Sequence, residues 1–498
     1  MFIFIKLFFI FLAIRTCFWH LQNWQIREYR FDRLKSYFRT HDGKKNLFNL
    51  YFFKGILPRP KFSGRVFLIL VFFLIFSYFE ILFLSLKLIY KNFFECWKIE
   101  TFFCDNLAFF NDLFLILIWE RSIFLLIALS VFISKFPVFL VQKFIFLRAK
   151  KIIDNSKNII RIGITGSYGK SSTKKILIHL LVFAFGEKNV LYNPGNQNTE
   201  VSIAKLILKN KKFFLEKNKE KKFLIIEVGA YKKGEIKKVC NFFQPNLGII
   251  TGINNQHLDL FGSQKNIQEA KFELAEKTQQ KVFFNADNVL LSEIFADKKI
   301  SATKIAIKKS AIKNIKKYQA KTEFFIYGKN FLLPWPGEFF VQNALLALEL
   351  CRELKISVSD LAKFLKKIPP LSQALTLEKF KKGSLLKDLY SANLNGVLSA
   401  IEHLGTFGGK KIFVGIPLLE LGKNSETSHK KIFEVLKKIN AEVFWFKKDF
   451  SDLGKKICQK KFHADDIKIL KQMTQNLQEK DAILLESRLP EHVLKIFV

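Results

Sequence analysis

The residues of this chain best suited to chemistry form a short glycine loop, Thr165–Ser172, with the sequence TGSYGKSS. It follows a strand-like apolar run and opens a helical pattern. Gly166 and Gly169 let backbone N–H groups converge on phosphate oxygens, and the positive end of the helix favours the same anion. Lys170 would bridge the outer phosphates of a nucleotide. The hydroxyl of Ser171 would suit magnesium, which prefers oxygen ligands.

The loop alone is a weak signal. The strict P-loop spacing needs a glycine at position 164, which is Ile164. Three further side chains are candidates for the same site, and each also has a simple structural explanation. Glu227 could cap a helix, His257 could be a surface histidine, and Lys271 is one lysine in a lysine-rich chain.

Several stretches together resemble one family. Thr165–Ser172 is similar to the ATP loop of the Mur ligases, which join amino acids or peptides to a cell-wall precursor. The branch that adds D-alanyl-D-alanine to a UDP-linked muramoyl-tripeptide is indicated by further stretches, at residues 193–202 (NPGNQNTEVS), 227–236, 250–273, 285–288, 340–348, 388–396 and 418–429. The resemblance covers roughly residues 158–490, in order, and this collinearity is more specific than any one motif.

The resemblance implies a mechanism. ATP activates a carboxylate as an acyl phosphate, and an amine then attacks it. Ser171 and Glu227 would hold one magnesium ion, and Glu227, His257 and Lys271 would hold a second. A protonated lysine is a poor metal ligand, so the resemblance also implies that Lys271 is carbamylated, which gives it a carboxylate-like end.

The same resemblance assigns contacts to nucleotide and substrate. The expected nucleotide contacts are Thr165, Gly166, Ser167, Gly169, Lys170, Ser171, Ser172, Asn288, Asn343 and Asp388. The expected substrate contacts are Asn196, Asn198, Thr199, Glu200, Asn393, Ser487 and Arg488. Without the resemblance, positions 196–200 read as an Asn/Gly turn before a helix.

The chain departs from the family pattern mainly near its C-terminus. Phe339 stands where the family has histidine, Gln373 where it has arginine, Ser391 where it has asparagine and Leu485 where it has lysine. ATP and magnesium are therefore better supported than the exact substrate.

The first 150 residues are unusually apolar. The chain opens with MFIFIKLFFIFLAI, which has no small-residue cleavage site after it and is interpreted as an uncleaved anchor. Residues 66–86 form an apolar run with one charge, Glu80, and about 20 such residues cross a bilayer. Residues 107–141 hold two runs split by Glu120-Arg121, which fit two tilted spans, a re-entrant hairpin or one helix with a central ion pair.

The net charge and the cysteine content exclude few classes of function. The chain has 81 Lys+Arg against 43 Asp+Glu, a net charge of +38. Such an excess can mark nucleic-acid or membrane binding. Lysine, phenylalanine and isoleucine are over-used throughout, however, and no RNA-recognition or zinc-finger pattern occurs, so no nucleic-acid partner is expected. The cysteines lack metal-ligand or disulfide spacing; they are Cys17, Cys96, Cys104, Cys240, Cys351 and Cys458.

The alternation of strands and helices predicts an α/β fold in three parts. Residues 1–150 would be transmembrane helices, 151–368 a P-loop Mur ligase central domain with a parallel sheet, and 369–498 a Rossmann-like domain. The Lys-rich stretches 209–222 and 303–317 are interpreted as solvated loops or helix faces.

These features predict an ATP-dependent amide ligase anchored in the cell membrane, with its ligase domains in the cytoplasm. Basic residues between Arg27 and Arg65 favour that orientation. Expected partners are a UDP-linked or lipid-linked muropeptide, D-Ala-D-Ala and membrane lipid. Two alternatives remain: another ligase of the superfamily, of the folylpolyglutamate synthetase or polymer-extending kind, and a non-catalytic membrane scaffold that binds ATP.

Overall fold

The computed structural model describes residues 2–38, 60–95, 102–156, 158–195, 197–216, 220–254, 258–369, 375–389, 393–418, 421 and 424–497. The chain divides into two compact units, Met1–Phe144 and Ile145–Val498, and each is described by itself.

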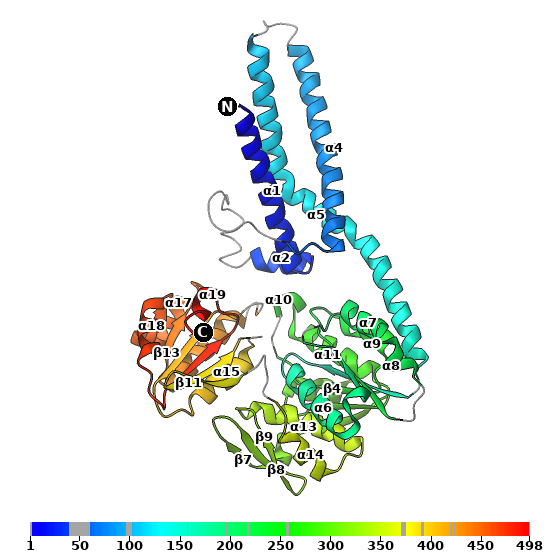
Figure 1. Ribbon diagram of the computed structural model, residues 1–498, viewed down its shortest axis with the longest axis vertical. Coiled ribbons are helices and arrows are strands. Elements are labelled where there is room, and N and C mark those ends of the chain that lie inside the picture. The colour runs from blue at the N-terminus through cyan, green and yellow to red at the C-terminus, as the bar shows by residue number, and fades with distance from the viewer. Residues whose placement is uncertain are drawn as a thin grey trace. The chain divides into compact units, whose positions relative to one another are not determined.

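The first unit is helical. Its elements are α1 (Phe2–Ile26), α2 (Phe31–Phe38), α4 (Gly64–Glu95) and α5 (Phe102–Asp154), drawn from blue to cyan in Figure 1. Of the three readings of 107–141, the structure shows one continuous helix. The ion pair considered at Glu120-Arg121 rests on side chains that lie outside the described ones. The first unit has a core of its own, in which Leu21 and Trp24 of α1 cluster with Ile69 of α4 and Ile127 of α5.

Two of these helices are long and apolar enough to cross a membrane. The segments are Gly64–Leu86 and Ser122–Asp154, with mean hydropathies of 2.7 and 2.4. A core helix of a soluble protein is mostly buried, whereas only 22% and 28% of these segments' most apolar windows are buried. Phe67 and Leu125, for example, are 68% and 67% exposed. Glu80 of α4 accepts a hydrogen bond from Ser122 of α5 at 2.8 Å, which satisfies the one acid of the first segment.

The second unit begins with a parallel sheet covered by helices on both faces. The strand order is β2-β3-β1-β4-β5-β6, and every neighbouring pair is parallel. The strands are β1 (Ile159–Thr165), β2 (Val190–Tyr192), β3 (Lys222–Glu227), β4 (Leu247–Ile250), β5 (Lys281–Asn285) and β6 (Thr303–Ile307). The predicted parallel sheet is confirmed.

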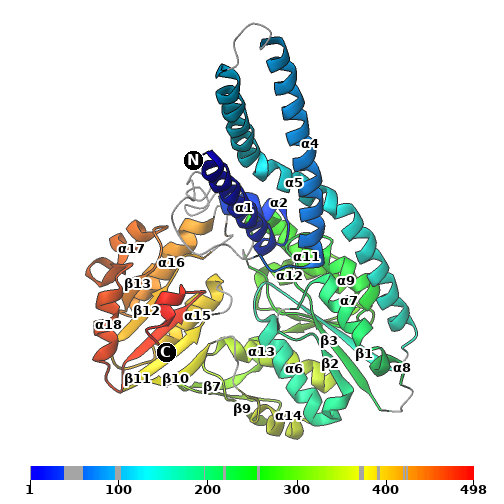
Figure 2. The same cartoon turned by 45° about the horizontal axis from the view of Figure 1, so that its top comes forward.

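The helices form two layers around this sheet (Figure 2). One apolar core contains residues of α6 (Lys170–Phe185), α13 (Phe339–Glu353) and α14 (Val358–Leu365). The other contains residues of α7 (Glu200–Lys209), α8 (Lys211–Leu215), α9 (Glu235–Phe243), α10 (Leu258–Phe261), α11 (Gln264–Lys277) and α12 (Val289–Asp297), together with Ala149, Ile152 and Ile153 from the end of α5. The last turns of α5 thus belong to the second unit.

One expectation about the lysine-rich stretches is wrong. Residues 303–317 are neither loop nor helix over most of their length, because β6 and β7 (Lys313–Lys317) lie there. β7 pairs with β8 (Thr322–Ile326), which pairs with β9 (Lys329–Leu333), in an antiparallel sheet. The lysines of β7 are exposed while Ile315 packs on the core, so a solvated charge run also fits a half-buried strand.

The remainder of the second unit contains a second sheet with the order β10-β11-β15-β12-β13-β14, antiparallel only between β10 and β11. Its strands are β10 (Thr376–Phe380), β11 (Gly383–Asp388), β12 (Lys411–Gly415), β13 (Glu442–Trp445), β14 (Phe462–Ala464) and β15 (Ala482–Glu486). Its helices are α15 (Leu394–Leu404), α16 (Ser425–Lys438), α17 (Ser451–Cys458), α18 (Ile467–Gln475) and α19 (Glu491–Leu494). Both sheets fall within one compact unit, so a domain boundary at residue 368 stays a prediction.

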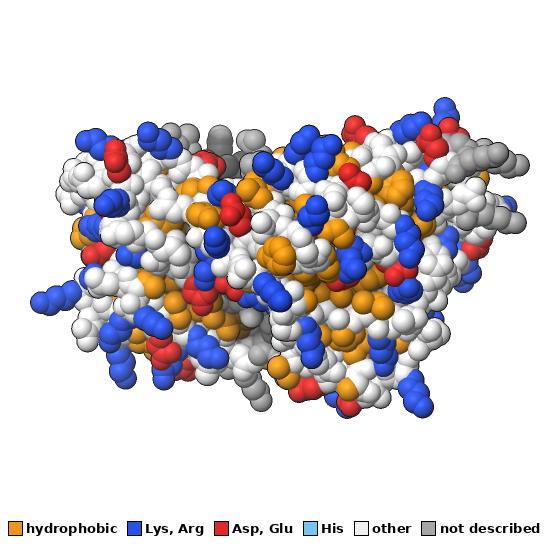
Figure 3. All heavy atoms as spheres, turned by 90° about the horizontal axis from the view of Figure 1, so that it is seen from below, with side chains coloured by type: hydrophobic (Ala, Val, Ile, Leu, Met, Phe, Trp, Pro, Cys, Tyr) orange, Lys and Arg blue, Asp and Glu red, His pale blue; other side chains and the backbone are white. Residues whose placement is uncertain are grey.

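Basic side chains do not gather into one patch on the face drawn in Figure 3. Lys and Arg are spread over it among carboxylates and neutral side chains. This dispersion fits solvated lysines better than a single track for a polyanion.

Candidate active site

The glycine loop connects β1 to α6 at the edge where the parallel strands end. Gly169 has a left-handed backbone with φ +78°, and a Cβ there would collide with the amide of Asn343. At Gly166, with φ +151°, a Cβ would collide with the hydroxyl of Thr251. Both positions therefore need glycine, as a loop that closes around a phosphate requires.

Neighbouring strand ends hold the loop in place. The backbone N–H of Ser167 donates to the carbonyl of Gly252 at 2.7 Å, and the Thr165 hydroxyl donates to the carbonyl of Val228 at 3.0 Å. The Ser167 hydroxyl is buried and has no hydrogen-bond partner within the described part of the chain. An unused buried donor beside a helix N-terminus fits a phosphate oxygen as its acceptor.

Lys170 is folded over its own loop. Its Nζ donates to the carbonyls of Gly166 at 2.7 Å and Ser167 at 3.3 Å. Burial lowers the pKa of Lys170, Glu227 opposes that shift, and Lys174 adds to it. The ammonium is thus held where the outer phosphates of a nucleotide would meet the loop.

Glu227, the last residue of β3, lies beside the loop and is 2% exposed. Its Oε1 accepts a hydrogen bond from the Ser171 hydroxyl at 3.2 Å, and its Oε2 forms an ion pair with Lys174 Nζ at 3.0 Å. Because its carboxylate contacts these two side chains of α6, the helix-cap reading does not describe it. Carboxylate and hydroxyl oxygens side by side are the donor set that magnesium prefers.

Lys271 lies on α11, is 3% exposed, and donates weakly to the carbonyl of Ala230 at 3.4 Å. Burial, and next the charge of Lys170, lower the pKa of Lys271 to about 7. The two lysines are thus close enough to influence each other. Glu273, in the same A-K-x-E stretch, accepts from the backbone N–H of Lys237 at 2.9 Å, so it ties α11 to the start of α9. His257 lies outside the described residues.

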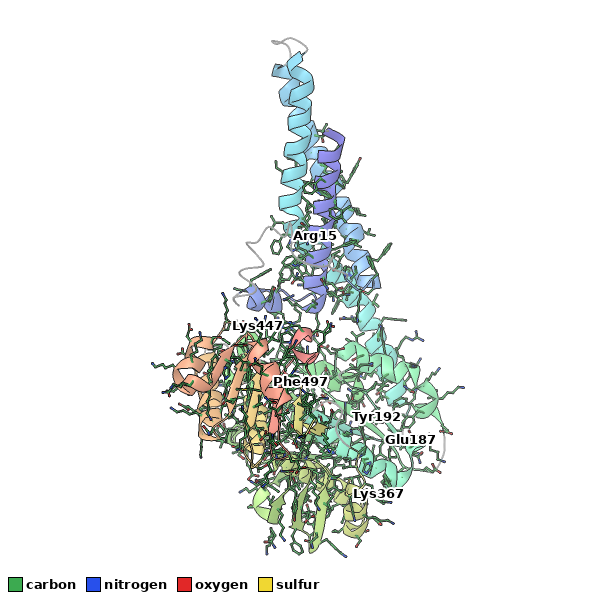
Figure 4. The ribbon with its side chains drawn as sticks, turned by 60° about the vertical axis from the view of Figure 1, so that its left-hand side comes forward. Arg15, Glu187, Tyr192, Lys367, Lys447 and Phe497 are labelled. Atoms are coloured by element: carbon green, nitrogen blue, oxygen red, sulfur yellow. The ribbon has the colours of Figure 1, made fainter. Side chains whose placement is uncertain are left out.

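A cavity of about 800 Å³ runs along the loop and α6. Of the expected nucleotide and substrate contacts, its lining includes Ser167, Gly169, Lys170, Ser171, Ser172, Asn343, Asp388 and Asn393. Asn343 donates to the Ser172 hydroxyl at 2.9 Å, which fixes α13 against the start of α6. The side chains of Glu187 and Tyr192, labelled in Figure 4, also line this cavity.

Several other predicted contacts have structural partners instead. Asn288 caps α12 through the N–H of Leu291 at 3.1 Å and donates to Tyr168 at 3.2 Å. Thr199 caps α7. Thr165, Gly166 and Ser487 are absent from the cavity lining. Three more predicted contacts are absent as well: Asn198 packs against Gly229, Glu200 opens α7, and Arg488 is exposed after β15. Asn196 lies outside the described residues, as do two of the departure positions, Gln373 and Ser391.

The C-terminal sheet places two acids side by side. Asp388 and Glu486 are register partners at the ends of the parallel strands β11 and β15. Burial raises the pKa of Asp388 to about 6, and burial together with Asp388 raises the pKa of Glu486 well above its usual range. Neither carboxylate oxygen of Glu486, nor the Ser487 hydroxyl, has a hydrogen-bond partner among the described residues.

Sequence reasoning missed two residues of this site. Lys174 pairs with Glu227, and Asn193 holds the Glu227 backbone, accepting from its N–H at 2.9 Å and donating to its carbonyl at 3.0 Å. Lys174 is one of many lysines in the chain, so its residue type alone does not indicate a site. Its helical spacing, one turn after Lys170 on the same face, was the one available signal. Phe339, where the family has histidine, lines the cavity with its ring 4.0 Å from that of Phe340.

Comparison with known proteins shows which enzymes this chain is similar to. Residues 164–351 match the Mur ligase middle domain. The UDP-N-acetylmuramoyl-tripeptide--D-alanyl-D-alanine ligase of Buchnera aphidicola subsp. Acyrthosiphon pisum is 31% identical over 286 residues, which are 54% of this chain and 60% of that enzyme. The ligase of the same description from Bacillus subtilis is 28% identical over 283 residues, 55% and 60% of the two chains.

Solved structures agree on the fold. MurF from Acinetobacter baumannii has a TM-score of 0.63 at 21% identity, over 71% of this chain and 80% of that one. MurF from Thermotoga maritima in complex with ADP has a TM-score of 0.59 at 24% identity, over 72% and 83%. The chain spans about 60% of the length of the first curated relatives it matches. The predicted resemblance is confirmed: residues 164–351 match the Mur ligase middle domain, and the chain is similar to ligases of the MurF branch.

Proposed function

We propose that the protein is an ATP-dependent amide ligase of peptidoglycan precursor synthesis, which adds D-alanyl-D-alanine to a muramoyl-tripeptide. The observation that carries this proposal is the contact between Ser171 of the phosphate loop and Glu227, beside Lys170 and the fully buried Lys271. The curated relatives are named for this reaction.

The chain's residues would act mainly by positioning anions. The loop N–H groups, the Ser167 hydroxyl and Lys170 would bind the ATP phosphates. Ser171 and Glu227 would hold one magnesium ion, and Glu227, His257 and Lys271 a second. Magnesium would draw charge from the phosphate oxygens as they accumulate it. A substrate carboxylate would attack the γ-phosphorus and release ADP, and the incoming amine would then displace phosphate from the acyl phosphate.

Carbamylation of Lys271 belongs to this proposal. With its pKa lowered to about 7, Lys271 offers a neutral amine near physiological pH. That amine adds to CO2, forming an N–C bond and releasing one proton, and the product is an anionic carbamate that can face magnesium. Carbon-13 NMR of the protein in labelled bicarbonate should show one carbamate signal, which is lost in Lys271→Met. The absence of that signal from an active preparation would remove this part of the proposal.

The apolar helices support anchoring in the membrane with the ligase part in the cytoplasm. Their exposed faces fit lipid. The resemblance also implies that they stand where the family has an N-terminal domain for the uridine nucleotide. We infer that the acceptor is a UDP-linked or lipid-linked muropeptide met at the membrane. Carbonate washing should leave the full chain in the membrane pellet. Release into the soluble fraction would contradict anchoring but not ligase activity.

The decisive experiment measures phosphate release by the full chain in lipid vesicles. ATP is supplied with UDP-linked or lipid-linked muropeptide, each with and without D-Ala-D-Ala. The proposal predicts release only when acid and amine substrates are both present. The departures at Phe339 and Leu485 favour testing a second candidate, a ligase for another acid and amine. ATP binding without release for any pair would instead favour the non-catalytic scaffold.

A further inference from the structure

Lys174 stands one helical turn after Lys170 on α6 and is 6% exposed. Its ammonium has three oxygen partners. These are Glu227 Oε2 at 3.0 Å, the carbonyl of Asn193 at 3.1 Å and the carbonyl of Gly195 at 3.2 Å. Two N–H groups donate to the carbonyls, and the ion pair with Glu227 compensates the charge of the buried ammonium.

The two carbonyls belong to the segment 193–195, between β2 and α7. Asn193 also holds the Glu227 backbone through two hydrogen bonds, at 2.9 and 3.0 Å. Its amide donates in addition to the carbonyl of Gln197 at 2.9 Å, which shapes the same segment. The segment and Glu227 are therefore joined twice, through Asn193 at the backbone of Glu227 and through Lys174 at its carboxylate.

Lys174 also lines the cavity that contains Lys170 and Ser171. Its partner Oε2 accepts no well-aligned hydrogen bond from any described residue, so the ion pair with Lys174 is the contact that balances this oxygen. A divalent ion held by Glu227 would meet the ammonium on the same carboxylate. Two cations that share one buried carboxylate repel each other, and the repulsion is strong where water is scarce.

We propose that Lys174 is a positioning residue that links metal binding at Glu227 to the segment 193–195. The ammonium competes with a divalent metal for the carboxylate. When the metal binds, Lys174 bonds more strongly to the carbonyls of Asn193 and Gly195 and orders this segment, which lines the cavity. The role assigned to the metal rests on the proposed function, but the linkage itself is a property of binding and needs no turnover.

The test titrates Mn²⁺ alone into the full chain in detergent, without nucleotide, and follows free Mn²⁺ by electron paramagnetic resonance. Lys174→Met keeps most of the side-chain volume and removes the charge. It should bind Mn²⁺ about tenfold more tightly than the wild type, because the competing cation is gone. Lys174→Arg should keep the wild-type affinity. Lys205→Met, an exposed lysine of α7, is the matched control and should change nothing.

Hydrogen exchange measures the second effect in the proposal, which is the ordering of the segment 193–195 when the metal binds. In the wild type, Mn²⁺ should slow exchange of the amides around 193–200, and Lys174→Met should abolish that effect. A purely structural lysine predicts the opposite affinity result, since its loss would loosen the site and weaken Mn²⁺ binding. Unchanged or weaker affinity would overturn the proposal. Should Lys174→Met not fold, a wild-type exchange rate in 193–200 that ignores Mn²⁺ would also overturn it.

Failure of the ligase proposal gives a different pattern. Phosphate release would then be absent for every substrate pair, while the Mn²⁺ titrations could still show the competition with Lys174. The two proposals are therefore tested separately.

Discussion

The two sheets of the second unit differ in what surrounds a carboxylate at a strand end. In the first sheet, Glu227 is surrounded by a hydroxyl, an ammonium and an asparagine. In the second sheet, Asp388 faces another acid, Glu486, and neither Glu486 oxygen has a hydrogen-bond partner among the described residues. A buried acid stays charged when cations and donors surround it, and it takes up a proton when they do not.

This difference parallels the departures from the family pattern. The phosphate loop keeps its glycines, lysine and serine, whereas Leu485 replaces a family lysine next to Glu486. Burial raises the pKa of both strand-end acids, and the charge of Asp388 raises that of Glu486 further. The first sheet thus surrounds its strand-end carboxylate with polar and cationic partners, while the second places two buried acids with raised pKa values side by side.

The comparison is tested most strongly at Lys170. Replacing it by methionine removes the cation that would meet the outer phosphates, so ATP-dependent phosphate release should fall by roughly 10²–10³-fold. The fold should survive, since the hydrogen bonds of the ammonium within the described part of the chain go to carbonyls of its own loop. Steady-state phosphate release measures the effect, with Lys205→Met as control. Near-normal activity would mean that the loop does not bind the reacting phosphates.

The glycine loop gives the next largest effect. Gly169→Ala must place a side chain at φ +78° and push it against Asn343, so nucleotide affinity should fall about tenfold or more. Gly186→Ala is the matched control, because Gly186 has φ +88° but open space around it. Calorimetric titration with ADP should show the loss for Gly169→Ala alone. An equal loss in both variants would point to backbone strain in α6 rather than to the phosphate cradle.

How far the sequence alone could predict this molecule depends on how local each feature is. The loop, the strand before it and the helix after it are contiguous, so their pattern was sufficient. The pairing of Ser171 with Glu227 was expected only through the family resemblance, since 56 residues separate them.

Non-local features were missed for physical reasons. In the sequence Lys174 cannot be distinguished from an exposed lysine, because only the folded structure brings its ammonium next to Glu227. The strand β7 was missed because all but one of its side chains are polar, and its pairing with β8 is what makes it a strand. Asn288 was expected at the nucleotide, yet its side chain caps α12, a role that spacing alone does not distinguish from binding.

The acid pair predicts an unusual dependence of stability on pH. In the unfolded chain Asp388 titrates near its ordinary value of 3.8, and in the folded protein near 6. Between these values the folded state binds more protons, so this contribution to stability is complete at low pH and lost as the pH rises through about 6. The raised pKa of Glu486 extends the loss to higher pH.

Glu486→Gln should therefore stabilise the protein, and more so near pH 8 than near pH 5, because glutamine stays neutral and can donate to Asp388. Thermal unfolding at the two pH values measures the difference. Glu442→Gln, at the start of β13 beside His463 and away from the pair, controls for the change of charge. A gain of equal size at both pH values, or a loss, would contradict raised pKa values of the pair as the source of this pH dependence.

The smallest expected effect concerns Asn393, where it distinguishes a capping role in the fold from a contact with substrate. Its side chain caps α15 by accepting from the N–H of Gly396 at 3.1 Å, and it also lines the cavity. Asn393→Ala should lower the free energy of unfolding by about 1 kcal/mol, whereas Asn393→Ser keeps a capping oxygen and should cost less than half of that. If Asn393 serves only α15, substrate KM follows stability and Asn393→Ser behaves as wild type. If it also contacts substrate from the second sheet, both variants raise KM alike although Asn393→Ala is the more destabilised, and that outcome would give the second sheet a binding role.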